Sequence, residues 1–163
     1  MKSLKSIDAI IFDFDGVLTD NNVYVSEDGK EQVKCSRSDG LAFSELRKLK
    51  IKSFIISTEK NKVVYQRGKK LGIPVLYGVE DKVKALESLV TKEGLELDKI
   101  LFIGNDLNDL KVMQACGYSA CPSDSHERIK EISSYTLNKK GGEGIVREVI
   151  ESILEIDTSS ILY

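Results

Sequence analysis

The chain has 163 residues, a mass of 18.2 kDa and a formal net charge of −2, from 24 Lys and Arg against 26 Asp and Glu. This length fits one domain with a full hydrophobic core. The charge balance excludes proteins that coat nucleic acid or anionic membrane, because these need a basic excess. No apolar run reaches the ~18 residues of a transmembrane helix. Three cysteines without a CxxC pair are typical of a reducing compartment, so we expect a cytoplasmic location.

Short apolar runs alternate with longer helical patterns along the chain. The pattern predicts strands at 9–14, 53–57, 75–77, 99–103 and 118–121, and helices at 39–50, 61–71, 81–93, 107–116 and 143–155. Residues 23–26 and 32–35 interrupt this alternation and flank the turn signal Asp28-Gly29, which predicts a β-hairpin. Strands that alternate with helices predict right-handed crossovers and a Rossmann-like parallel sheet covered on both faces. We therefore expect a single α/β domain over 1–163, with a tail at 156–163.

Polar side chains follow the predicted strands at the point where each strand ends. Asp13 and Asp15 end the first strand, Ser57 and Thr58 end the second, and residues 104–109 follow the fourth. In an open α/β sheet, ligands bind beyond the carboxyl ends of the strands. The chemically capable side chains of this sequence should therefore share one edge of the sheet.

The acidic residues at this edge indicate a metal site. Asp13 and Asp15 are two residues apart, so on a strand their side chains project to the same side; alone, Asp15-Gly16 could simply start a turn. Asp106 and Asp109 follow the fourth strand, which should return close to the first. Carboxylates gathered in one cleft repel each other unless a cation is present. Mg²⁺, a hard ion that prefers oxygen ligands, would remove the repulsion.

Lys82 would supply the other positive charge. It opens a predicted helix, where the helix dipole disfavours a cation, and this position favours a functional role over a solvated lysine. Ser57 or Thr58 could cap the following helix or bind phosphate oxygens. An Asp nucleophile, a metal, a lysine and hydroxyl donors together are typical of phosphoryl transfer.

The order of these motifs resembles the haloacid dehalogenase superfamily of phosphatases. The resemblance is carried by Asp13-Phe14-Asp15-Gly16-Val17, Ser57, Lys82 and Gly104–Asp109. Two further motifs, Ser38-Asp39-Gly40 and the run from Lys140 to Gly144, are similar to the branch that acts on 3-deoxy-D-manno-octulosonate 8-phosphate and on sialic-acid-type sugars. This branch implies a β-hairpin at 23–35, no large cap domain, and a homotetramer in which a neighbour helps to close the active site.

The resemblance also implies a role for each matching residue. Asp13 would attack phosphorus and form an aspartyl-phosphate, and Asp15 would protonate the leaving sugar oxygen and then activate water. Ser57 and Lys82 would hold the phosphoryl oxygens.

The metal ligands implied by the resemblance include one open alternative. Mg²⁺ would lie between Asp13, the backbone carbonyl of Asp15 and the cluster after the fourth strand, with Asp109 in support. Many relatives have Asp where this chain has Asn105. Either Asn105 coordinates through its amide oxygen, or Asp106 takes this place.

Five further residues are candidates for contact with the substrate: Thr58, Asp39, Gly40, Arg67 and Lys140. Arg67 could bind a sugar carboxylate or be a solvated helix arginine. Lys140 could reach a neighbour's substrate or be an ordinary loop lysine.

The function expected from these features is that of a Mg²⁺-dependent phosphomonoesterase acting on a phosphorylated 2-keto-3-deoxy sugar acid. The alternatives are a nine-carbon, sialic-acid-type 9-phosphate as substrate, or a catalytically silent oligomerisation module of the same fold. A signalling receiver domain is disfavoured, because receivers take the phosphoryl group on a middle strand, whereas here the paired Asp residues follow the first strand.

Overall fold

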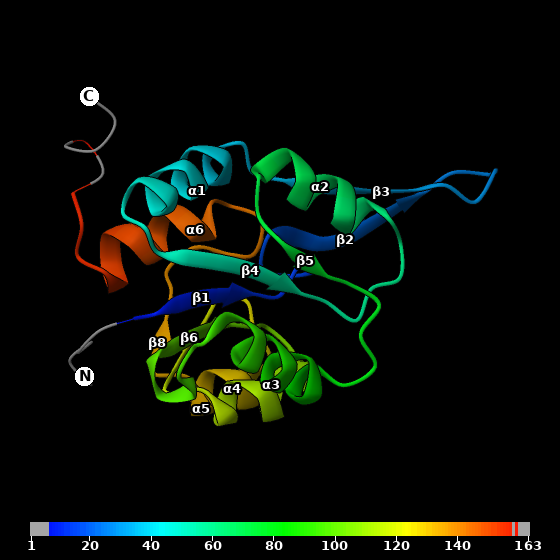
Figure 1. The fold of residues 1–163 in the computed structure, drawn as a ribbon. Coiled ribbons are helices and arrows are strands. Elements are labelled where there is room, and N and C mark those ends of the chain that lie inside the picture. The colour runs from blue at the N-terminus through cyan, green and yellow to red at the C-terminus, as the bar shows by residue number, and fades with distance from the viewer. Residues whose placement is uncertain (1–6, 158, 160–163) are drawn as a thin grey trace.

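The computed structural model describes residues 7–157 and 159, and over these residues it shows a parallel β-sheet between two layers of helices (Figure 1). The sheet has the strand order β5-β4-β1-β6-β7-β8, and every pairing within it is parallel. Its strands are β1 (Ala9–Phe12), β4 (Lys52–Ile56), β5 (Val75–Leu76), β6 (Ile100–Ile103), β7 (Tyr118–Cys121) and β8 (Tyr135–Thr136). The predicted α/β fold class is confirmed.

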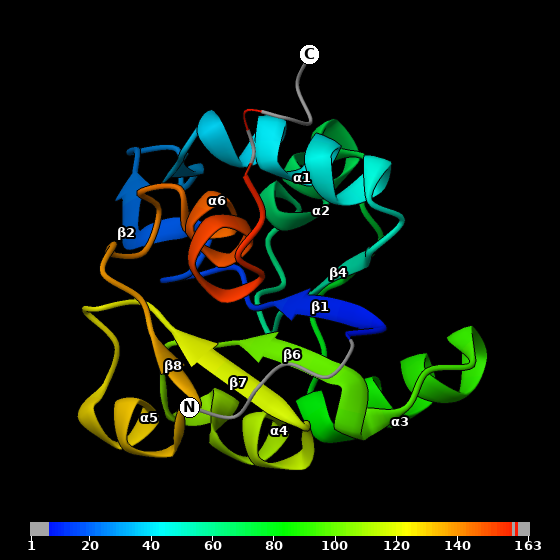
Figure 2. The same cartoon turned by 90° about the vertical axis from the view of Figure 1, so that its left-hand side faces the viewer.

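Helices cover both faces of this sheet (Figure 2). One layer holds α1 (Ser38–Lys48), α2 (Val63–Leu71) and α6 (Ile145–Glu148), and the other holds α3 (Lys82–Glu93), α4 (Leu110–Ala115) and α5 (Glu127–Ile132). Short 3₁₀ turns, η1 (Leu97–Lys99) and η2 (Leu107–Asp109), flank β6, and the π-helical segment η3 (Val149–Ile153) continues α6. The helix predicted at 143–155 is therefore confirmed in place, with a change of helix type inside it.

Strand β1 lies at the centre of the sheet and is buried on both faces. Ile10 and Phe12 pack into the core beneath α1 and α6, whereas Ala9 and Ile11 pack into the core beneath α3 and α4. The ring of Phe12 meets that of Phe43 edge to face, with centroids 5.2 Å apart. A central parallel strand is covered on both sides, so an uninterrupted apolar run is its normal sequence pattern. This burial fixes where the carboxyl end of β1 points.

The predicted hairpin is present as β2 (Thr19–Val25) and β3 (Glu31–Cys35), and it projects from the body of the molecule (Figure 1). The pairing of the two strands is irregular between Thr19 and Val23. Its outer part exposes the apolar side chains of Val23, Tyr24 and Val25 by 51%, 60% and 67%. The hairpin therefore carries an apolar surface that the described part of the chain does not cover.

Some elements differ from the sequence-based expectation. The edge strand β8 was not predicted, because two residues are too few to produce an alternating pattern. The predicted tail at 156–163 lies largely outside the described residues. Within residues 7–157 and 159, no helix is long and apolar enough to cross a membrane.

Candidate active site

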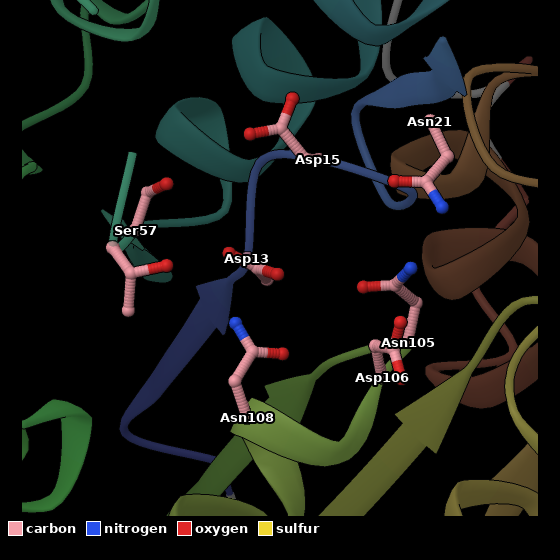
Figure 3. A pocket seen from close by; sticks show the side chains of 8 residues that line it. Asp13, Asp15, Asn21, Ser57, Asn105, Asp106 and Asn108 are labelled. Atoms are coloured by element: carbon pink, nitrogen blue, oxygen red, sulfur yellow. The ribbon is translucent and has the colours of Figure 1, made fainter. Parts of the chain in front are cut away.

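A pocket of about 120 Å³ opens at the carboxyl ends of β1, β4 and β6. Figure 3 shows the side chains that line it. They are Asp13, Asp15, Asn21, Ser57, Thr58, Asn105, Asp106 and Asn108. The strand order brings these segments together, since β1 pairs with β4 on one side and with β6 on the other. The shared edge predicted from the sequence is present.

Lys82 lies beneath this pocket and joins two carboxylates. Its Nζ lies 2.7 Å from Asp13 Oδ1 and 2.6 Å from Asp109 Oδ1, and all three side chains are almost fully buried. The lysine is the first residue of α3, and the adjacent Asp81 caps that helix by accepting hydrogen bonds from the N–H groups of Val83 and Lys84. One ammonium group thus faces two carboxylates, so with both carboxylates ionised the group of three carries one uncompensated negative charge.

Burial and charge shift the pKa of both partners upward. Burial, reinforced by Asp109 and opposed by Lys82, raises the pKa of Asp13 to about 8. Burial alone would lower the pKa of Lys82, but Asp13 and Asp109 outweigh it, so the net shift is also upward. Lys82 therefore stays charged, and a second positive charge bound beside Asp13 would lower the raised pKa of that carboxyl group.

Asp15 is held by the hydroxyl group of Thr19. The Thr19 Oγ1 accepts hydrogen bonds from the N–H groups of Gly16 (3.1 Å) and Asn21 (3.2 Å), and it donates its own proton to Asp15 Oδ1 at 3.4 Å. Burial and then Glu59 raise the pKa of Asp15, while the hydrogen bond from Thr19 lowers it. The net shift is upward, which is the direction that favours a role as a proton donor.

The loop after β6 presents Asn105 and Asp106 differently. The N–H of Asn105 donates to Asp109 Oδ2 at 2.9 Å. Asp109 therefore holds this loop with one oxygen and Lys82 with the other. A Cβ atom at Gly16 would lie 1.9 Å from Asn105 Nδ2. The nitrogen thus packs against Gly16, and the amide oxygen turns toward Asp13 (Figure 3). Asp106 is exposed, and its side chain accepts the N–H of Leu107 at 2.7 Å as the cap of η2.

Ser57 forms one wall of the pocket and is buried. Its Oγ accepts a hydrogen bond from the N–H of Glu59 at 3.1 Å. Helix α2 begins only at Val63, with no side-chain cap at Lys62, so the predicted capping of this helix by Ser57 or Thr58 is wrong. The loop from Ser57 to Lys62 separates strand β4 from the start of helix α2.

Four predicted substrate-binding residues lie outside the pocket of this chain: Asp39, Gly40, Arg67 and Lys140. Asp39 is buried against α6, where its Oδ1 accepts the N–H of Val146 at 3.2 Å. Arg67 donates from Nη2 to the carbonyl oxygen of Ser36 at 2.7 Å, and the N–H of Lys140 donates to Glu143 Oε2 at 3.3 Å. Sequence reasoning placed Asn108 at this edge, within residues 104–109, but gave it no role, and it missed Asn21, which also lines the pocket. The run of polar residues after the first strand was the available signal for Asn21.

The donor atoms of the pocket fit a hard divalent cation. Within the described part of the chain, no three His, Cys, Asp or Glu side chains are grouped as a metal site. The expected ligands are instead mixed oxygen donors: the Asp13 carboxylate, the Asp15 carbonyl and the Asn105 amide. Oxygen donors of these kinds suit Mg²⁺, and two carboxylates that share the single ammonium group of Lys82 favour a cation in this place.

Comparison with known proteins identifies the family. Residues 44–149 match the model of the haloacid dehalogenase-like hydrolases. The chain belongs to the haloacid dehalogenase-like hydrolases. This confirms the resemblance expected from the sequence, and with it the expectation of a phosphatase.

Individual relatives show which of these hydrolases the chain is similar to. The chain is 32% identical to 3-deoxy-D-manno-octulosonate 8-phosphate phosphatase KdsC of Salmonella typhi, over 94% of this chain and 82% of that protein. It is 31% identical to N-acylneuraminate cytidylyltransferase A of Danio rerio, over 85% of this chain but only 33% of that protein. A crystal structure of the Moraxella catarrhalis octulosonate 8-phosphate phosphatase, in complex with magnesium, phosphate and KDO, superimposes with a TM-score of 0.89 at 35% identity, and covers 94% of this chain and 89% of that one.

Proposed function

We propose that the protein is a Mg²⁺-dependent phosphatase that removes phosphate from a phosphorylated 2-keto-3-deoxy sugar acid through an aspartyl-phosphate. The observation that carries the proposal is the buried group of Asp13, Lys82 and Asp109 at the base of an oxygen-lined pocket. Lys82 holds Asp13 in place at 2.7 Å and adds a positive charge where a phosphate group would be bound.

The following roles are proposed for the side chains of the site. A carboxylate oxygen of Asp13 attacks phosphorus while the bond from phosphorus to the sugar oxygen breaks. Asp15 gives its proton to that leaving oxygen, and later takes a proton from the water that hydrolyses the aspartyl-phosphate. Lys82 and Ser57 bind the transferred phosphoryl oxygens. Asp13, the carbonyl of Asp15 and Asn105 would hold Mg²⁺, which supplies positive charge to the phosphate when bound.

An eight-carbon substrate of the 3-deoxy-D-manno-octulosonate 8-phosphate type is the first candidate, because a solved relative that covers most of the chain carries this activity in its name. A nine-carbon, sialic-acid-type 9-phosphate is the second candidate. It is supported by the similarity to the zebrafish N-acylneuraminate cytidylyltransferase.

Phosphate release from a panel of eight- and nine-carbon sugar-acid phosphates, with and without Mg²⁺, tests the proposal. We expect Mg²⁺-dependent turnover of at least one member. The variant Asp13→Asn keeps the size of the buried side chain, so it should lose turnover by a factor of at least ~10³ while staying folded; the loss of a covalent nucleophile has effects of this order. Retained turnover in this variant would refute the mechanism. An inactive wild-type protein that still forms a stable oligomer would support the silent module instead.

We also propose that the protein assembles as a homotetramer. The support is the projecting hairpin, whose exposed Val23, Tyr24 and Val25 put apolar side chains on both faces of β2, where neighbouring copies could cover them. Two-stranded hairpins are marginally stable on their own, so contact with a neighbour would also stabilise this element. The cytoplasmic location stays a prediction from cysteine usage.

A further inference from the structure

Asn21 adopts a backbone conformation that side chains usually avoid. Its φ angle is +63°, in the left-handed region. Among the described residues, the other non-glycine positions with positive φ are Lys50 and Glu155, and neither lines the pocket. Asn is one of the few residues that tolerate this region, and such conformations persist where the surrounding structure enforces them, often at functional sites.

The surroundings of Asn21 show what enforces this conformation. The residue lies where the pairing of β2 with β3 is irregular, between Thr19 and Val23. Its N–H donates to Thr19 Oγ1, the same hydroxyl group that donates to Asp15. The backbone of Asn21 is therefore fixed by the same hydroxyl group that positions the proposed acid, Asp15.

The side chain of Asn21 points into the pocket. Figure 3 shows its amide above Asn105, on the side of Asp15 opposite Ser57, while the carboxylate of Asp15 points away from it. The phosphoryl group would be bound near Asp13 by Lys82 and Ser57, and Asp15 would contact the oxygen that leaves. The rest of the pocket must then hold the leaving group, and Asn21 lines this part of it.

We propose that Asn21 is a specificity residue that hydrogen-bonds a hydroxyl group of the polyol chain next to the phosphate ester. This rests on the proposed function and deepens it. A primary amide both donates and accepts hydrogen bonds, so it matches a hydroxyl group, which does the same. The other side chains that line the pocket include three carboxylates, Asp13, Asp15 and Asp106. The neutral Asn21 can contact a polyol phosphate without adding repulsion.

The test compares two substrates in the variants Asn21→Gly and Asn21→Asp. The substrates are a sugar-acid phosphate and p-nitrophenyl phosphate, an aryl ester that has no polyol hydroxyl. Glycine removes the amide and tolerates the positive φ angle, whereas Asp keeps the size and adds a charge. We expect the ratio of kcat/KM for the sugar-acid phosphate to kcat/KM for the aryl ester to fall about tenfold in Asn21→Gly, which corresponds to one lost hydrogen bond. We expect this ratio to fall in Asn21→Asp as well.

A matched control separates the side-chain effect from the backbone effect. Lys50 has a φ angle of +59° and precedes β4, so it lies at the amino end of that strand, away from the pocket. Lys50→Gly makes the same backbone change there and should leave the ratio unaltered. Thermal unfolding of each variant checks that it is folded.

The outcomes distinguish this inference from the proposed function. If wild type hydrolyses both substrates and the ratio in Asn21→Gly stays within twofold of wild type, the inference is wrong and the proposed function stands. If wild type hydrolyses the aryl ester but none of the sugar-acid phosphates, the substrate in the proposed function is wrong, and so is the role of Asn21 in binding it.

Discussion

At the scale of single residues, Thr19 is the point where three backbone and side-chain groups meet. Its buried hydroxyl group has two lone pairs, which accept the N–H groups of Gly16 and Asn21, and one proton, which goes to Asp15. Because both lone pairs are occupied, the direction of the proton is determined. Thr19 is therefore a positioning residue for the proposed acid.

Replacing Thr19 tests this role. Thr19→Val keeps the shape but removes the hydrogen bond to Asp15, together with the acceptor for Gly16 and Asn21, so kcat for a sugar-acid phosphate should fall at least about tenfold, since a bond of this kind is worth roughly 1.5 kcal/mol. Thr19→Ser keeps the hydroxyl group and should restore most of kcat. Steady-state kinetics measures both. A Ser variant as slow as the Val variant would show that the methyl group, not the hydroxyl, matters.

The two residues that could hold the metal can also be separated. The amide oxygen of Asn105 faces Asp13, whereas Asp106 is exposed and caps a short helical turn. We expect Asn105→Asp to lower the Mg²⁺ concentration for half-maximal activity roughly tenfold, because affinity rises with the charge of the ligands. Asp106→Asn, the matched control, should change it by less than twofold. A larger effect at Asp106 than at Asn105 would reverse the assignment.

At the scale of elements, charged side chains are buried where α1 packs against α6. Glu45 of α1 is fully buried, and its Oε1 lies 3.6 Å from Arg147 Nη2. Asp39 at the start of α1 accepts one hydrogen bond from α6, and its Oδ2 is buried without a hydrogen-bond partner. Burial raises the pKa of Asp39 to about 6, although the N–H of Val146 and nearby Arg67, Lys139 and Arg147 oppose the shift.

This pKa predicts a pH-dependent stability. The native state binds the Asp39 proton more tightly than the unfolded state, so the contribution of Asp39 to the free energy of unfolding falls as pH rises from about 4 to about 6, and stays low above. A shift of this size corresponds to roughly 3 kcal/mol. Asp39→Asn, which removes the charge, should raise the free energy of unfolding by about 1–3 kcal/mol at pH 8, and by much less at pH 4.5. Urea denaturation at the two pH values measures this. An equal change at both would contradict it.

At the scale of the whole molecule, the projecting hairpin is the element through which we propose that the protein assembles. Tyr24→Asp replaces an exposed apolar side chain of the hairpin by a charge, so the proposed tetramer should give way to smaller species, as measured by size-exclusion chromatography with light scattering. Leu41→Asp is the control, since Leu41 is exposed on α1 to a similar extent. A wild-type protein that is monomeric at micromolar concentration would refute the proposed assembly.

Much of the site could be predicted because a parallel sheet gathers the ends of its strands at one edge. Asp13, Ser57 and Lys82 followed from strand and helix boundaries alone. Asn21 could not be predicted, since it depends on an irregular strand pairing that leaves no clear sequence signal. Asp39 was expected near the substrate, whereas the structure packs it against α6, because the packing of distant helices is not encoded in a local motif.

The sheet order also has a consequence for how the chain reaches its folded state. Ile10 of β1 pairs with Ser53 on one side and with Leu101 on the other, so the central strand finds its partners far along the sequence. Contacts of high sequence separation slow folding, because loop-closure entropy must be overcome before they form. During synthesis, β1 emerges first but stays without one of its neighbours until β6 has left the ribosome. An incomplete chain therefore exposes a strongly apolar strand, which makes this protein a good candidate for aggregation when synthesis is interrupted.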